Sequence, residues 1–159
     1  MNCQTGETIA SEQIEVESRE KVLRALDQVT NKLRAHMGES LASIQKYDAP
    51  IEQATTTSLE ALRAYSMGVR TASADDQKGA IQYYEQATEL DPNFAMAYAR
   101  LGSSSYDLNH ASTANAATRR AYELRGQVSE RERFYIESHY YMFVTGEIEK
   151  AIQVYQLWK

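Results

Sequence analysis

The chain has 159 residues, of which 43% are hydrophobic and 25% charged, a composition that predicts roughly one globular domain with its own core. Only two prolines and seven glycines interrupt it, which favours long helices over a turn-rich β architecture. The net charge of −5, without a dense cluster of Lys and Arg, argues against nucleic-acid binding, and no apolar run is long enough to predict a membrane span or a signal peptide. The compartment is left open.

Residues 1–56 are predicted to be a distinct N-terminal segment, because they carry no internal repeat. Gln4-Thr5-Gly6 predicts a turn, and the weak alternation over residues 9–14 is that of an isolated strand without a partner. A helix is predicted from Ser18 to His36 and ends at Gly38. Its apolar stripe recurs at spacings of 4, 3 and 4, at Val22, Leu26, Val29 and Leu33.

From residue 57 onward the chain follows a 34-residue period. Small residues recur at that distance, Gly68 as Gly102, Ala80 as Ala114, and Ala87 as Ala121. Such positions mark places where two helices approach closely, and a period of this length is typical of stacked helix pairs. We place the repeats at about 61–94, 95–128 and 132–159, the last incomplete. Ala151 follows Ala114 by 37 positions, so about three residues are inserted near 126–131.

Helix-start motifs refine these boundaries. Thr57 with Glu60 and Ser129 with Glu132 each form the S/T-x-x-E capping box, and Asp91-Pro92 is a further expected helix start. The helices are therefore predicted at about 58–72, 76–90, 92–106, 111–125, 130–144 and 147–158.

The pattern of Gly68, Ala80, Tyr84, Ala87 and Pro92 resembles the tetratricopeptide repeat (TPR) family. The resemblance implies an all-α, right-handed superhelical solenoid of helix-turn-helix units, at residues 57–159, preceded by an extra N-terminal helix. Thr71, Ser105 and Thr118 depart from the larger residues usual in that family.

The stretch from Asn2 to Glu7, together with Leu33-Arg34, residues 38–41 and residues 58–62, resembles a bacterial multidomain family. In that family a TolB-like domain runs into TPR repeats, often attached to a serine/threonine kinase or a winged-helix domain. The resemblance implies that residues 1–56 are a remnant of an upstream domain and that this chain is a fragment.

The TPR resemblance also implies a binding groove on the first helix of each repeat. Transferred by register, its residues are Leu62, Tyr65, Val69, Met96, Ala99, Ser103, Tyr106, Arg133, Ile136, Tyr140 and Phe143. Tyrosines suit such a groove because they combine a large contact area with a polar tip, although the same side chains could instead pack between helices. Co-chaperone TPR domains grip the C-terminal carboxylate of a peptide with a Lys and an Asn, and Tyr65 and Val69 occupy those two places here. A carboxylate clamp of that kind is therefore not expected.

Catalysis is not expected. His36, His110 and His139 are scattered, Cys3 is a single thiol, and we find no metal-ligand spacing, phosphate-binding loop or nucleophile elbow. We therefore predict no catalytic, cofactor or metal site.

We predict a scaffold that binds a peptide or partner helix, in bacterial signalling or regulation. The alternative is a module that oligomerises or positions the rest of its parent. Under either hypothesis, an uncovered apolar face at the C-terminal helix is expected to drive self-association, through Ile148, Ile152, Tyr155 and Trp158.

Overall fold

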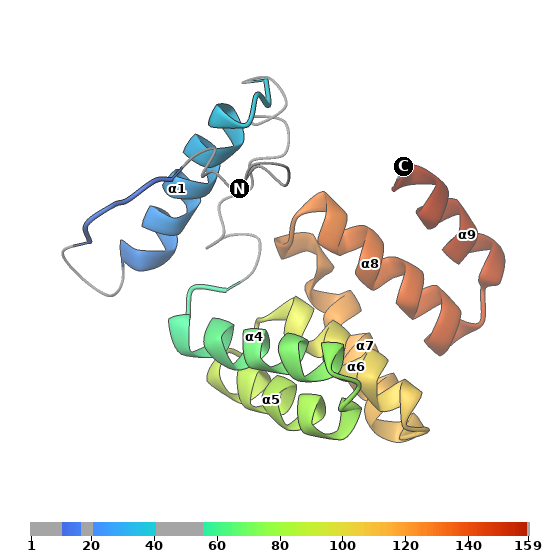
Figure 1. The fold of residues 1–159 in the computed structure, drawn as a ribbon. Coiled ribbons are helices and arrows are strands. Elements are labelled where there is room, and N and C mark those ends of the chain that lie inside the picture. The colour runs from blue at the N-terminus through green and yellow to red at the C-terminus, as the bar shows by residue number, and fades with distance from the viewer. Residues whose placement is uncertain (1–10, 17–20, 41–55, 159) are drawn as a thin grey trace. The chain divides into compact units, whose positions relative to one another are not determined.

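The computed structural model of the protein describes residues 11–16, 21–40 and 56–158. In these residues every regular element is helical and no β-strand occurs, which confirms the all-α class for the described part (Figure 1). None of the described helices is long and apolar enough to cross a membrane. The chain divides into two compact units, Met1–Glu52 and Gln53–Lys159.

The described helix of the first unit is α1 (Val22–His36). Its end agrees with the sequence, because Gly38 adopts a φ of 87° and the Glu39 amide donates to the Arg34 carbonyl at 3.1 Å. Glu12, in the extended segment before the helix, lies 3.2 Å from Nδ1 of His36. The segment and the helix are thus held together by a polar contact at the helix end.

The predicted apolar stripe of α1 does not coincide with its buried face. Leu26 is 45% exposed, whereas Leu23 and Ala25 are buried. Ala25 faces a hollow that it shares with Ile14 and Val16 of the extended segment. The position of this segment, rather than the helical period of apolar residues, therefore determines which side of α1 is covered. No strand is assigned at 11–16, and the predicted turn at residues 4–6 lies outside the described residues.

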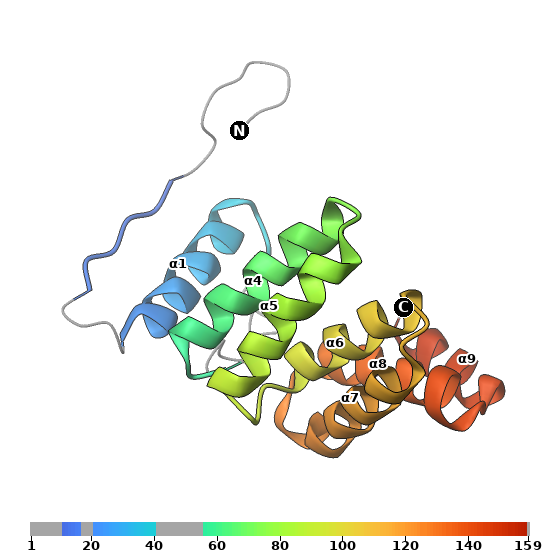
Figure 2. The same ribbon diagram turned by 90° about the horizontal axis from the view of Figure 1, so that it is seen from below.

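The second unit consists of three helix pairs that follow one another along the chain, with the helices of each pair antiparallel (Figures 1 and 2). The helices are α4 (Leu59–Ser73), α5 (Gln77–Leu90), α6 (Ala95–Asp107), α7 (Ala111–Leu124), α8 (Glu130–Tyr140) and α9 (Ile148–Leu157). Four of the predicted helices match to within one residue at each end. The predicted helix 130–144 is α-helical only to Tyr140 and continues as a π-helix, Tyr141–Thr145.

The helix predicted at 92–106 begins later, at Ala95. Asp91 does not cap a helix at Pro92, because its Oδ1 instead accepts from the Asn93 amide at 2.9 Å and closes a local turn. The hydroxyl of Thr56 also donates to the Asp91 carboxylate. Both contacts hold Asp91 outside the helix.

The predicted capping box at Thr57 and Glu60 is also shifted, whereas the one at Ser129 is confirmed. Ser58, not Thr57, is the N-cap of α4, and its Oγ accepts from the Ala61 amide at 3.1 Å. At the start of α8, Ser129 and Glu132 form the complete reciprocal box. A short 3-10 helix, Arg125–Gln127, lies in the region where inserted residues were expected.

A left-handed residue closes the turn inside each helix pair. Asp75, Asn109 and Gly146 have φ values of 65°, 58° and 71°. The amides of Asp76 and His110, the next residues after the first two, donate back to Thr71 and Ser105 at 3.2 and 2.8 Å. The left-handed positions are separated by 34 and 37 residues, so the backbone repeats the period that the small residues predicted.

Glycine sets the separation of the helices in the first two pairs. A Cβ on Gly68 would lie 2.6 Å from Cε1 of Tyr84, whose side chain is 1% exposed. A Cβ on Gly102 would collide with Oγ1 of Thr118, which occupies the same place in the next pair. These contacts agree with the role expected for Gly68 as a tight helix contact.

Two clusters of buried side chains form the core of the second unit. The larger is rich in alanine and spans α4 to α8, with Phe94 and Ile136 as its largest fully buried apolar members. The smaller contains Ala80, Tyr84, Leu101 and Ala117 and lies between the first two pairs. Such close packing of small residues leaves little room for added atoms.

Gly68→Ala tests the helix contact. We expect it to lower the free energy of unfolding by about 1–3 kcal/mol, because Tyr84 is enclosed and cannot move aside. Gly126→Ala is the matched control, since no atom lies within 4 Å of the added methyl and its φ is not positive. Urea denaturation measures both, and equal midpoints for the two variants would contradict the contact.

Candidate functional site

The first helices of the three pairs bring an arginine and two tyrosines together. Arg100 of α6 donates from Nη1 to the Tyr135 hydroxyl of α8 at 3.3 Å, and its guanidinium carbon lies 4.7 Å from the centre of the same ring. The Tyr65 phenol of α4 is close enough to Arg100 to interact with it electrostatically. Arg100 therefore links all three helix pairs.

Tyr65 is itself anchored in the core. Its ring lies 4.9 Å from that of Phe94 and 5.9 Å from that of Tyr84, centroid to centroid. Burial raises the pKa of the Tyr65 phenol and raises the pKa of Tyr84 to about 12. Both phenols are consequently neutral at pH 7, and neither supplies a negative charge to Arg100.

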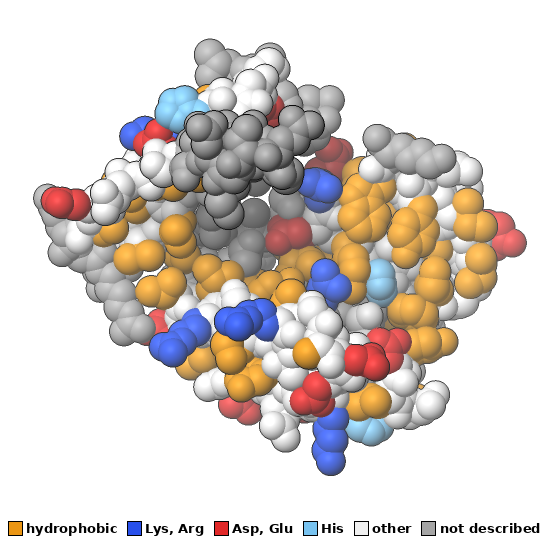
Figure 3. All heavy atoms as spheres, viewed as in Figure 1, with side chains coloured by type: hydrophobic (Ala, Val, Ile, Leu, Met, Phe, Trp, Pro, Cys, Tyr) orange, Lys and Arg blue, Asp and Glu red, His pale blue; other side chains and the backbone are white. Residues whose placement is uncertain are grey.

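A chain of aromatic contacts runs outward from Tyr135 along α8. Its members, the aromatic row, are Tyr106, Phe143, His139, Tyr135 and Trp158. Tyr106 stacks on Phe143 with centroids 4.1 Å apart, and the Tyr135 and His139 rings are 4.0 Å apart. Figure 3 shows apolar side chains covering much of α8 and α9 on the face it draws.

Tyr106 is the most accessible member of the row. It is 49% exposed, and its partner Phe143 is half-buried in the π-helix that follows α8. Single π-helical turns often occur at functional positions in helices. An exposed, stacked aromatic pair offers a large apolar contact area together with a hydroxyl.

His139 connects the exposed pair with the arginine. Its Nδ1 lies 2.8 Å from the carbonyl oxygen of Tyr135. Burial lowers the pKa of the His139 imidazole, and the positive charge of Arg100 lowers it further. The hydrogen bond to the Tyr135 carbonyl and the charge of Asp107 raise it, but burial prevails. The neutral imidazole is thus favoured in the folded protein.

The groove residues expected from the register are distributed over three environments. Met96, Ala99 and Ile136 are buried in the larger core cluster, because three first helices converge there. Tyr140 faces α7, where its ring stacks on Tyr122 with centroids 3.8 Å apart. The remaining positions are half-buried or exposed, namely Leu62, Tyr65, Val69, Ser103, Tyr106, Arg133 and Phe143.

Four residues of the site were not among the expected groove residues: Arg100, Tyr135, His139 and Trp158. Arg100, Tyr135 and His139 are each next to a position used in the register transfer, so a pattern based on four fixed positions passes over them. Trp158 follows α9, which is not a first helix and so contributes no position to that pattern. The sequence cue available was the dense aromatic content of residues 134–143, which carries a Phe, three Tyr and a His before Phe143.

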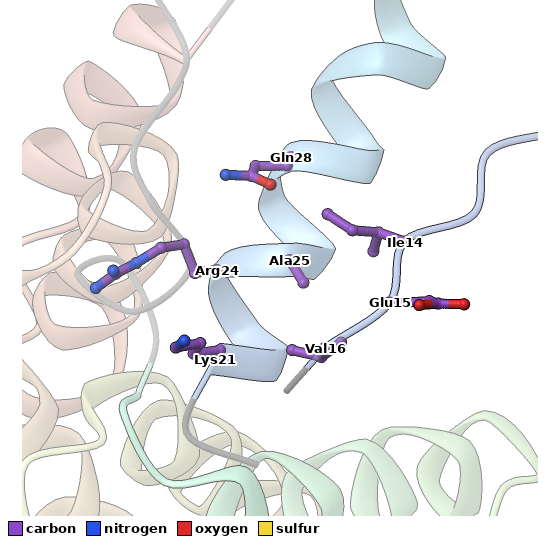
Figure 4. A pocket seen from close by; sticks show the side chains of 7 residues that line it. All are labelled: Ile14, Glu15, Val16, Lys21, Arg24, Ala25 and Gln28. Carbon is purple, nitrogen blue, oxygen red and sulfur yellow. The ribbon is translucent and has the colours of Figure 1, made fainter. Parts of the chain in front are cut away.

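Two hollows lie away from this site. One, of about 270 Å³, lies in the first unit between the extended segment and α1; Figure 4 shows Ile14, Val16 and Ala25 along it, with Lys21 and Arg24 at its edge. The other, of about 430 Å³, is lined by α4 and α5, through Glu60, Arg63, Ala64, Met67, Tyr83 and Gln86. Both are open at the surface.

Residues 11–16, 21–40 and 56–158 contain no group of three or more His, Cys, Asp and Glu side chains that could hold a metal ion. No family model matches this chain, and no curated protein matches it in a sequence search.

The electrostatic coupling of His139 to its neighbours can be measured directly. Arg100→Gln is expected to raise the pKa of His139, because it removes a positive charge, and Asp107→Asn is expected to lower it. NMR titration of the imidazole follows both changes. In the parent chain the His139 pKa should lie below the ordinary value of about 6.5, and shifts of the same sign in both variants would contradict the assignment.

Proposed function

We propose that the second unit is a TPR-type solenoid whose first helices bind a peptide or partner helix. The supporting features are three antiparallel helix pairs, glycine contacts repeated at Gly68 and Gly102, and left-handed turn residues that recur after 34 and then 37 residues. For residues 1–56 we propose, from the sequence resemblance, an origin in an upstream TolB-like domain of a bacterial signalling or regulatory protein.

The observation that carries the binding proposal is the exposed stack of Tyr106 on Phe143, continuous with His139, Tyr135 and Arg100. Aromatic side chains and arginine are enriched among the residues that dominate binding energy at interfaces. Contacts between neighbouring rings restrict the side chains of the row, which lowers the entropy that they lose on binding.

Peptides selected from a displayed random library against the whole chain provide the test. We expect Tyr106→Ala combined with Phe143→Ala to weaken binding of the selected peptides by about tenfold or more, measured by fluorescence anisotropy. Leu90→Ala is the control, because Leu90 on α5 is 45% exposed and lies outside the row. Selection of no peptide, or equal affinity for both variants, would contradict the proposal.

A second candidate function is self-association through α9, as expected from the sequence. Ile148, Ile152 and Tyr155 share one side of the helix and are 47%, 50% and 38% exposed, whereas Ala151 and Val154 on the neighbouring side are buried. An exposed apolar face of this kind favours an interface, here with a second copy of the chain.

Ile152→Glu tests this candidate. The parent chain is expected to sediment above its single-chain mass of 18.0 kDa, and the variant at that mass. Gln153→Glu, an exposed change on the same helix, should leave the mass of the assembly unchanged. A parent chain that sediments as a monomer at micromolar concentration would exclude assembly through α9.

A further inference from the structure

Arg100 differs from other arginines of the described residues in its charge environment. Arg34, Arg120 and Arg125, which are also half-buried, each form an ion pair with a glutamate. Among the described residues, no ion pair joins Arg63, Arg70, Arg119 or Arg131 to a carboxylate, but these four are exposed. Arg100 forms none with any described residue, and its partners are the hydroxyl and the ring of Tyr135. In a chain of net charge −5, a half-buried guanidinium without a carboxylate partner in the described part is an exception.

The hydrogen-bonding capacity of Arg100 is also incompletely used. Its Nε is buried and has no hydrogen-bond partner. A guanidinium has five N–H donors, and a partly dehydrated cation without an anion is unfavourable. The site therefore gains free energy when an acceptor of negative charge approaches the accessible part of the guanidinium.

The nearby acidic side chains of the second unit have other roles. The carboxylate of Glu132 accepts from the amide and the hydroxyl of Ser129 at 3.0 and 2.8 Å, in the capping box of α8. Asp107 acts on His139 at the outer end of the row. Neither carboxylate forms an ion pair with Arg100.

We propose that Arg100 is the anion subsite of the peptide-binding surface and takes a carboxylate of the bound peptide, next to an apolar or aromatic residue that packs on the aromatic row. This inference rests on the proposed function. The planar fork of a guanidinium matches a carboxylate, and the Tyr135 hydroxyl that accepts from Arg100 can donate its own hydrogen to the same ligand.

The chemistry favours a carboxylate over a phosphate. Phosphopeptide sites usually gather several arginines around a group that carries close to two negative charges. Here a single arginine is surrounded by phenols that are neutral at pH 7, because the ordinary pKa of tyrosine is about 10 and burial raises the pKa of Tyr65 and Tyr84 further. One cation among neutral donors matches the single charge of an Asp or Glu side chain.

A double-mutant cycle on the selected peptides tests the subsite. We expect the peptides to contain an acidic residue, and replacement of that residue by its amide to weaken binding to the parent chain by about tenfold. On Arg100→Gln the same replacement should change affinity less than about twofold. Amidated and free-terminus peptides distinguish a side-chain carboxylate from a terminal one, and Arg100→Lys should retain part of the effect.

The outcomes separate this inference from the proposed function. Peptides that lack acidic residues, that lose equal affinity on both proteins, or that bind only when phosphorylated would overturn the carboxylate subsite, while sensitivity to Tyr106→Ala with Phe143→Ala would still support the groove. If no peptide binds, both proposals fail.

A second measurement avoids dependence on the stability of the variant. In the parent chain, the Arg100 Nε–H resonance should shift on addition of an acidic peptide and not on addition of its amide form. An unchanged Arg100 resonance at saturating acidic peptide would overturn the subsite, even if Arg100→Gln fails to fold.

Discussion

The close approach of the helices in the first two pairs is the constraint on which the second unit depends. Gly68 presents bare backbone to the buried ring of Tyr84, and Gly102 does the same for Thr118. Because these contacts fix the separation of the helices, they also fix the direction in which the first helices project their outer side chains. The meeting of Tyr65, Arg100 and Tyr135 from three separate helices is a consequence of that spacing.

Much of the fold could be predicted because small residues that recur at a fixed period mark the positions where neighbouring helices approach closely. The turns could not be predicted, because Asp75 and Asn109 adopt the left-handed conformation that usually requires glycine. Their short polar side chains tolerate this conformation, so no glycine marks these turns in the sequence. Asp91 was misleading for a related reason, because the same side chain can cap a helix or close a turn. Here the side chain closes the turn and also accepts a hydrogen bond from Thr56, a residue distant in sequence.

The site was less predictable than the fold. Positions transferred by register describe an ideal repeat of constant length. In the third helix pair the spacing is 37 residues and a π-helix continues α8, so the side chains that are buried there differ from those of an ideal repeat. Ile136 consequently enters the core and Tyr140 stacks on α7, while Tyr135 and His139 reach the surface beside Arg100. Such differences of one position on a helix are decided by packing across several elements.

Because Arg100 is a half-buried cation in an acidic chain, salt affects the association rate and the dissociation rate of an acidic peptide differently. At long range an acidic peptide experiences the net charge of −5 and is repelled, so added salt accelerates its association by screening that repulsion. At short range the guanidinium is held by the Tyr135 ring and hydroxyl, in surroundings that salt screens less. An acidic ligand of Arg100 would therefore arrive slowly at low ionic strength and leave slowly at any ionic strength, with its residence time set by the local contact.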